Sequence, residues 1–353
     1  MAIQIHAPAT ARHLFHSLVW ASLPAALIGI WNLGFQLLTA QAAPTLFAGL
    51  HLAPDPDSII SCLAAGAVVM APLLATATLV SGFWAWGFST LRRVPVDAAW
   101  FPMAWLFVLL LPPSTSLPAA ALAMSFAAVV GAHIFGGSGR YLASPALLGA
   151  LFLTMSYPEF AATPLSLSEA SITSSWAQFA ANGIQDNALL PYALGREIGA
   201  IGAVSAFACL AGALYLIYAG TASWRIVAGG ILGAMIFSTV LSWTGIEATL
   251  PGQWHLALGN LAFTLAFLVT DPGAAPLTRP SRWLLGFTTG ALTVLIRTLD
   301  PVHPEAVLHA ALLSMLAVPL WDYLVVRRAT ARGPAARARG PSARGASRTV
   351  VPM

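Results

Sequence analysis

The feature of this chain best suited to binding a ligand is a glycine-rich turn followed at once by the start of a helix. Gly136, Gly137 and Gly139 stand shortly before Ser144 and Pro145, which open an apolar segment. Successive backbone N–H groups in such a turn, with the positive end of the helix, can hold an anionic or carbonyl-rich ligand. The glycines can also serve only to let short helices pack closely. The turn is therefore a candidate binding site, with close packing as the alternative.

The apolar segment after this turn is too short to cross a membrane unaided. Pro145 to Tyr157 is 13 residues, or about 20 Å of helix, whereas a bilayer core is roughly 30 Å thick. No spacing of cysteine and histidine typical of a metal site occurs in the sequence, and Cys62 and Cys209 both lie in apolar runs. We predict no metal ligand and no catalytic residue, and a site beside a broken helix.

Composition predicts an integral membrane protein with an all-α polytopic fold. Of the 353 residues, 58% are hydrophobic and 8% are charged, whereas a soluble domain is about 25% charged. A soluble fold of this length would need far more charged surface. We expect about ten transmembrane helices in the lipid bilayer, near residues 17–39, 58–88, 99–111, 117–135, 145–157, 197–219, 224–242, 254–270, 283–297 and 305–325.

The arginines indicate how the helices are oriented. All 16 cations are arginine, and placing both termini in the cytoplasm leaves only Arg196 and Arg297 outside, in agreement with the positive-inside rule. The arginine-rich end, residues 326–353, is predicted to be a disordered cytoplasmic tail close to the membrane. Nucleic-acid binding is the less economical explanation of that charge, and no nucleic-acid partner is predicted.

The prolines reveal an internal repeat. Pro113 and Pro145 are 32 residues apart and bracket a helix and a polar turn, and so are Pro272 and Pro304. Five spans per half would make the two repeats inverted, an arrangement that places a site near the membrane midplane at half-helix ends. The alternative is a chance likeness in a proline-rich chain. The predicted regions are a cytoplasmic N-terminus (1–16), a first five-helix repeat (17–158), an extracytoplasmic loop (159–196), a second repeat (197–325) and the tail (326–353).

Several blocks of this sequence resemble the RnfD/NqrB family in order and spacing. They are LPP at 111–113, FGGSGRYLASPALLG at 135–149, SWRI at 223–226, TDP at 270–272 and PLWDYL at 319–324. These proteins are the membrane subunits of the Rnf complex and of the sodium-pumping NADH:quinone oxidoreductase. Chain length and compact outer loops look closer to RnfD. The resemblance implies ten spans in two inverted repeats, partner subunits of an Rnf/Nqr-like complex, and the bacterial inner membrane.

The resemblance also implies an FMN bound through its phosphate to a threonine hydroxyl on the outer face. The family motif is roughly Asp-Gly-x-Ser/Thr-Gly-Ala-Thr, and its counterpart here runs from Glu159 to Leu165, with Thr163 as the attachment residue. This chain departs from the motif, because Tyr157-Pro158 replaces Asp-Gly, Phe160 replaces Ser/Thr and Ala161 replaces Gly. A turn opened by Thr163 and Pro164, without flavin, is the alternative.

A second, non-covalent flavin such as riboflavin is implied at the glycine turn, with Gly136, Gly137, Gly139 and Ser144 as binding residues. Relatives carry Asn-Pro-Phe-Asn-Pro where this chain has Tyr141-Leu142-Ala143-Ser144-Pro145, so both amides are absent. Ser144 keeps one hydroxyl at the helix N-cap, where it could cap the helix.

Two acids, Asp271 and Asp322, match the family blocks. Arg279 and Arg282 follow Asp271 closely in sequence, which favours a structural ion pair over a role in transport.

The sequence thus supports two hypotheses of different classes. The first is an electron-transferring subunit of an ion-translocating complex, coupled to Na⁺ or H⁺ and not an enzyme by itself, in which flavin supplies the redox chemistry. The second is a non-flavinylated channel, transporter or scaffold subunit, since inverted repeats with broken helices also occur in transporters.

Overall fold

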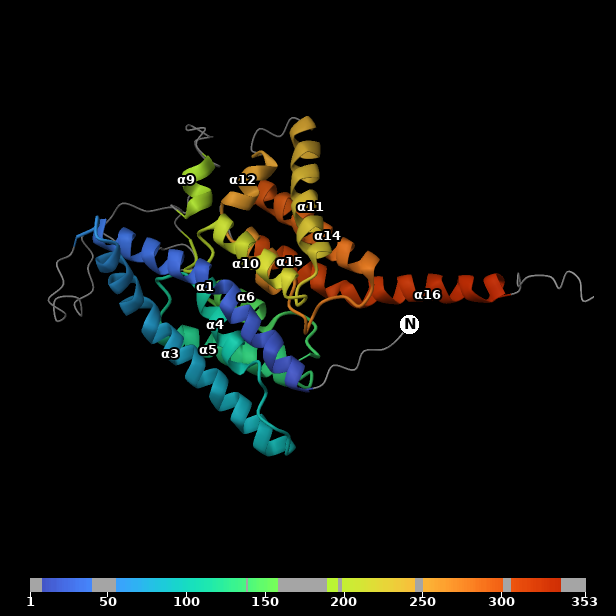
Figure 1. Cartoon of the computed structure of the whole chain (residues 1–353), viewed down its shortest axis with the longest axis horizontal. Helices are drawn as coiled ribbons and strands as arrows, with labels where there is room; N and C mark the ends of the chain where they lie inside the picture. The colour runs from blue at the N-terminus through green and yellow to red at the C-terminus, as the bar shows by residue number, and fades with distance from the viewer. Residues whose placement is uncertain are drawn as a thin grey trace, which may run out of the picture.

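The computed structural model describes residues 8–39, 55–137, 139–157, 189–195, 199–244, 250–300 and 306–337, with side chains described between residues 16 and 330 of these ranges. All regular elements in these ranges are helices, and no strand occurs among them. This confirms the all-α prediction for the described part of the chain. Figure 1 shows the helices packed against one another in one group, with α16 extending away from it.

The described residues of the first half form five helical elements. The side-chain hydroxyls of Ser58 and Ser116 accept hydrogen bonds from backbone N–H groups in the first turns of α3 and α5, and so fix where these helices begin. The elements are α1 (Pro8–Thr39), α3 (Ile59–Arg92), α4 (Trp100–Leu110), α5 (Leu117–Phe126) continued by a π-helix η1 (Ala127–His133), and α6 (Pro145–Ser156).

The described residues of the second half form three helices of 20 or 21 residues and several shorter ones. Ser205 and Thr278 accept hydrogen bonds from the first turns of α10 and α14. The elements are α9 (Leu189–Leu194), α10 (Ala206–Tyr218), α11 (Trp224–Trp243), α12 (Gly252–Ala257), α13 (Leu261–Phe263) with a π-helix η2 (Thr264–Leu268), α14 (Arg279–Leu299), α15 (Ala306–Leu316) and α16 (Val318–Arg337).

Four helical stretches in the described residues are long and apolar enough to cross a membrane. They are His16–Thr39, Ile59–Arg92, Trp224–Trp243 and the stretch Ala306–Thr330, which joins α15 to the first part of α16. Four further apolar helices are shorter: Trp100–Leu110, Leu117–His133, Pro145–Ser156 and Ala206–Tyr218. A helix needs about 20 residues to span a bilayer, so the described residues combine four full-length spans with four helices that are too short to cross alone. This is the composition of a polytopic membrane protein.

Glycines allow the closest helix contacts. A β-carbon on Gly66 of α3 would overlap the carbonyl oxygen of Ile30 in α1, and one on Gly290 of α14 would overlap the carbonyl oxygen of Gly230 in α11. Small residues at such contacts let membrane helices approach until their backbones touch. The pairs α1–α3 and α11–α14 are therefore held by van der Waals contact at glycine.

The two halves meet through α1 with α10 and through α6 with α15. Two backbone hydrogen bonds add to this contact, from Gly202 N–H to the Leu109 carbonyl (2.7 Å) and from Ile201 N–H to the Leu111 carbonyl (3.1 Å). In Figure 1, α6, α10 and α15 lie near the middle of the molecule, between α3 and α5 on one side and α11 and α14 on the other. The short helices α6 and α10, together with α15, thus lie at the centre of the fold.

Three predicted segments differ from the structure. The span at 254–270 is divided, because the chain turns at Gly259, whose φ of +73° suits glycine. The span at 197–219 begins as a helix only at Ala206, since residues 201 and 202 bond to the end of α4. Residues 326–337 of the predicted disordered tail are helical and continue α16, because alanine and arginine favour helix. The remainder of the tail, residues 338–353, lies outside the described residues.

Candidate functional site

The glycine turn has the left-handed backbone that its sequence suggests. The φ angles of Gly136, Gly137 and Gly139 are +112°, +91° and +84°, which residues with a β-carbon rarely adopt. However, Gly137 N–H donates to the Ala132 carbonyl (3.0 Å) and Gly136 N–H donates to the His133 carbonyl (3.2 Å). Both N–H groups are therefore used in hydrogen bonds to carbonyl groups at the end of η1 and are not directed at a ligand.

The surroundings of Gly137 favour the packing role of the turn. Gly137 is buried, and a β-carbon there would lie 3.0 Å from a carboxylate oxygen of Asp97. Asp97 also accepts a hydrogen bond from the Ala99 N–H at the start of α4 (3.0 Å). On the other side, Arg92 Nη2 donates to the His133 carbonyl (2.6 Å), and the His133 ring stacks on Phe88 at 4.8 Å. The turn is thereby fixed against the end of α3 and the start of α4.

Ser144 lies at the N-cap of α6, as predicted, but it does not cap the helix. Its side chain accepts no hydrogen bond from the first turn of α6, although Ser144 is 99% buried. Its hydroxyl instead hydrogen-bonds the Asp271 carboxylate. The expectation of a capping hydroxyl was wrong, because the hydroxyl is paired with an acid from the other half of the chain.

Asp271 follows directly after η2 and is buried in the same place. Its Oδ1 accepts a hydrogen bond from the Gly273 N–H (2.9 Å), which closes a tight turn. The predicted ion pair with Arg279 or Arg282 does not form. The Asp271 carboxylate is hydrogen-bonded to Gly273 and Ser144 instead. The guanidinium of Arg282 donates through Nε to the Pro276 carbonyl instead (2.9 Å).

The two loops that meet here each follow a π-helix. In η1, Ile134 N–H bonds to the Val129 carbonyl (2.9 Å), and in η2, Val269 N–H bonds to the Thr264 carbonyl (2.9 Å). Wide helical turns of this kind are frequent at functional sites. The site is therefore formed by one broken helix from each half of the protein.

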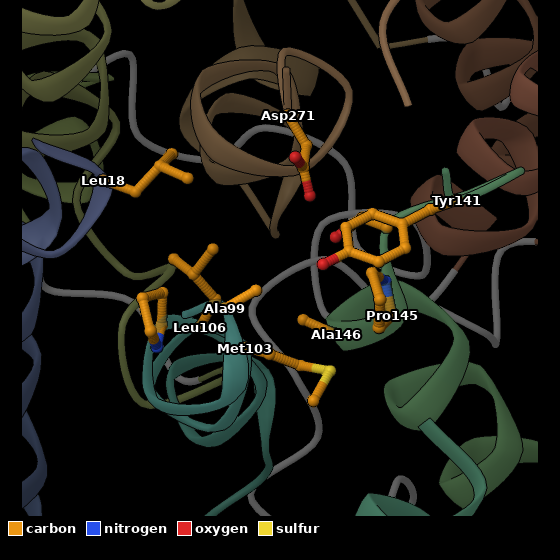
Figure 2. A pocket seen from close by; sticks show the side chains of 10 residues that line it. Leu18, Ala99, Met103, Leu106, Tyr141, Pro145, Ala146 and Asp271 are labelled. Atoms are coloured by element: carbon orange, nitrogen blue, oxygen red, sulfur yellow. The ribbon is translucent and has the colours of Figure 1, made fainter. Parts of the chain in front are cut away.

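A small cavity lies between these loops and α4. Its volume is about 20 Å³, enough for one water molecule. Leu18 of α1, Met103 and Leu106 of α4, and Tyr141, Ser144 and Asp271 are among the residues that line it. Figure 2 shows the Tyr141 ring reaching into this pocket, with its hydroxyl toward the middle and the Asp271 carboxylate above it. The cavity thus combines an apolar wall with three polar groups.

Burial controls the charge of both titratable groups in the pocket, which lie in loops outside the spans. Burial raises the pKa of the Asp271 carboxyl to about 6, although its hydrogen bonds to Gly273 and Ser144 lower it. Burial raises the pKa of the Tyr141 hydroxyl well above its usual value, and the nearby charges of Asp97 and Asp271 raise it further. Tyr141 is thus neutral at physiological pH, while Asp271 is close to the point at which it binds a proton.

Asp322 of α16 lies away from the pocket and holds the start of α14. It accepts hydrogen bonds from the Leu277 N–H (2.9 Å), the Thr278 N–H (3.1 Å) and the Thr278 hydroxyl (2.7 Å). Its carboxylate therefore satisfies backbone donors at the N-terminal end of α14, where negative charge is stabilising.

Arg297 was predicted as an outer-side charge, and the structure shows it completely buried near the C-terminal end of α14. Its Nη1 donates to the carbonyl oxygen of His255 (3.1 Å), and Gly259 leaves the room that its guanidinium occupies. Assigning charges to the two sides of the membrane cannot find this role, because the role depends on a contact with the turn at Gly259, which lies far from Arg297 in the sequence.

Other predicted features divide between those the structure describes and those it does not. Cys62 and Cys209 are buried, as expected, and form no disulfide bond. The described residues contain no group of three metal-binding side chains. Thr163, its motif from Glu159 to Leu165, and Arg196 lie outside the described residues.

Comparisons with known proteins identify the relatives of this chain. A family model described as the NQR2, RnfD, RnfE family matches residues 2–331. The B subunit of the Na(+)-translocating NADH-quinone reductase of Pseudomonas paraeruginosa (strain DSM 24068 / PA7) is 36% identical over 335 residues, covering 88% of this chain and 83% of the relative. The corresponding proteins of Azotobacter vinelandii (strain DJ / ATCC BAA-1303) and Neisseria meningitidis serogroup A / serotype 4A (strain DSM 15465 / Z2491) are 33% and 32% identical, with the same coverage. These relatives carry the name of the NADH-quinone reductase component, whereas length and loops had favoured RnfD. The chain belongs to the NQR2, RnfD, RnfE family.

Proposed function

We propose that this protein is a membrane subunit of an ion-translocating redox complex, in which it passes electrons through a flavin and couples them to Na⁺ or H⁺ movement. The observation that carries this proposal is its membership of the NQR2, RnfD, RnfE family over residues 2–331. Relatives that cover 88% of the chain are named as the B subunit of the Na(+)-translocating NADH-quinone reductase. Other subunits of such a complex are the expected partners, in a bacterial inner membrane.

The contacts at the candidate site support a role in coupling. The hydrogen bond from Ser144 to Asp271 joins the α6 end of the first half to the η2 end of the second half. Transporters place their sites at such ends of discontinuous helices, and their halves move against each other around the site. A change in the proton or charge carried by Asp271 would alter this side-chain bond across the junction.

We further propose that the two halves are inverted repeats of five helices each. In the first half α3 packs on α5 and α5 on α6, and in the second half α11 packs on α14 and α14 on α15. The contacts between halves, α1 with α10 and α6 with α15, then join equivalent helices, as a two-fold axis requires. The equal proline spacing in the two halves supports the same arrangement.

The flavin is proposed to be FMN attached to Thr163. A bound flavin can accept and release electrons one or two at a time, and the protein supplies its position and surroundings. The chain itself would hold the flavin through the threonine hydroxyl, orient it and keep the path between the halves closed to water.

The test is flavin fluorescence of the denatured protein. The full chain is expressed with and without a flavin transferase of a related host, separated on a denaturing gel and viewed under ultraviolet light. We expect a fluorescent band only with the transferase, and its loss in Thr163→Ala. Thr173→Ala, in the same predicted outer segment (159–196), is the matched control and should stay fluorescent.

The same experiment separates the alternative function. A band that stays dark with an active transferase would exclude covalent flavin here and favour a non-flavinylated channel or scaffold subunit. The departures at Phe160 and Ala161 are the sequence observation in favour of that outcome.

A further inference from the structure

The most distinctive residue of the candidate site is Tyr141, because its ring occupies the space that the surrounding helices leave. The residue is only 7% exposed although it lies in a loop. A β-carbon on Gly273 would lie 2.7 Å from the Tyr141 ring, so the ring is pressed directly against the loop that carries Asp271. In Figure 2 the ring lies between the side chains of Asp271 and Pro145. Tyr141 thus bridges the two halves of the protein as a packed side chain.

The family resemblance predicts a second, non-covalent flavin in this place, and the residues present do not fit one. The space left beside Tyr141 is about 20 Å³, whereas pockets for cofactors and other small molecules measure roughly 300–1,000 Å³. An isoalloxazine also needs polar groups that fix its edge. The Ser144 hydroxyl already bonds Asp271, and Gly136 and Gly137 direct their N–H groups into η1.

The remaining space is suited to water. A buried water molecule requires about 10–15 Å³ and two to four polar partners. The cavity is of this size, and Tyr141, Ser144 and Asp271 line it. A water molecule there would hydrogen-bond polar groups from both halves without demanding any rearrangement.

We propose that Tyr141 closes this pocket against flavin, so that this chain binds no non-covalent flavin between its two halves. The closed pocket does not depend on the flavin proposed at Thr163, which is a covalent group on another segment. The two are separable by experiment, because acid precipitation leaves covalent flavin with the protein and releases non-covalent flavin into the supernatant.

The first test uses the wild-type full chain, purified in mild detergent together with its partner subunits where these co-purify. Riboflavin is titrated against it and binding is followed by quenching of riboflavin fluorescence, while the acid supernatant is assayed for flavin that co-purified. We expect no saturable binding and no stoichiometric flavin in the supernatant. Saturable one-to-one binding that persists in Tyr141→Phe, which keeps the ring, would overturn the proposal.

The second test opens the pocket. The double variant Tyr141→Asn with Ser144→Asn removes the ring and supplies two amides, and we expect its riboflavin affinity to rise at least about tenfold. Leu142→Asn is the matched control, because it adds an amide in the same turn at an exposed side chain and should bind no better than wild type. A double variant that melts like wild type yet gains no affinity would contradict the closing role of Tyr141. If the double variant does not fold, the wild-type titration decides alone.

Discussion

The ionisation of Asp271 should make the stability of the protein depend on pH in a defined direction. Its carboxyl is buried, and its pKa is about 6 in the folded chain against 3.8 for the unperturbed group. A raised carboxyl pKa means that the folded state binds the proton more tightly than the unfolded state does. The contribution of this bound proton to the stability of the folded chain is therefore present in full below about pH 4 and is lost as the pH rises through 6.

The magnitude follows from the size of the pKa shift. One pKa unit corresponds to about 1.4 kcal/mol, so the shift is worth at most about 3 kcal/mol. In Asp271→Asn the amide oxygen can still accept from the Gly273 N–H, but the side chain no longer titrates. We expect the free energy of unfolding of wild type, relative to this variant, to rise by up to about 3 kcal/mol between pH 7.5 and pH 4.

The assay is unfolding of the purified chain in mild detergent at a series of pH values, followed by circular dichroism, for wild type and Asp271→Asn. Asp57→Asn serves as the control, since Asp57 is an exposed acid. The control should follow the wild-type pH dependence. A difference between wild type and Asp271→Asn that is constant with pH, or that grows as the pH rises, would refute the reasoning.

Two further predictions concern helix packing and capping. Gly290→Ala places a β-carbon on the Gly230 carbonyl oxygen and should destabilise the fold by about 1–3 kcal/mol, measured by thermal unfolding in detergent. Gly87→Ala, which meets no atom within 4 Å, should cost nothing, and equal costs would disprove the close-contact argument. Asp322→Ala removes three hydrogen bonds at the start of α14 and should cost about 2–3 kcal/mol by the same assay. Asp322→Asn keeps an acceptor and should cost less; identical losses would count against the cap.

Much of the fold could be predicted from the sequence because membrane helices carry a strong hydrophobic signal. Long apolar runs located α1, α3 and α11, and Pro145 marked the first turn of α6 because proline suits that position. The division of 254–270 into α12, α13 and η2 could not be predicted. It depends on the buried Arg297 guanidinium beside Gly259, a contact between segments far apart in sequence.

The candidate site was predicted in part. The glycines at 136, 137 and 139 were predicted to lie in a turn, and their positive φ angles place them in one. Sequence proximity suggested arginine partners for Asp271, whereas the tight turn at Gly273 directs its carboxylate toward Ser144. Tyr141 showed no signal beyond replacing an amide, because the Gly273 backbone that accommodates its ring is more than a hundred residues away in sequence.

The hydrogen bonds of Asp322 give α16 a mechanical connection to the site. This helix extends from the rest of the molecule and carries Arg327 and Arg328 on its exposed part (Figure 1). Because Asp322 accepts hydrogen bonds from Leu277 and Thr278, a force on α16 would act on the segment that begins at Asp271, as well as on α14 and α15. A partner protein or lipid surface that binds and displaces α16 would therefore transmit a force to the junction between the two halves, away from the binding position itself.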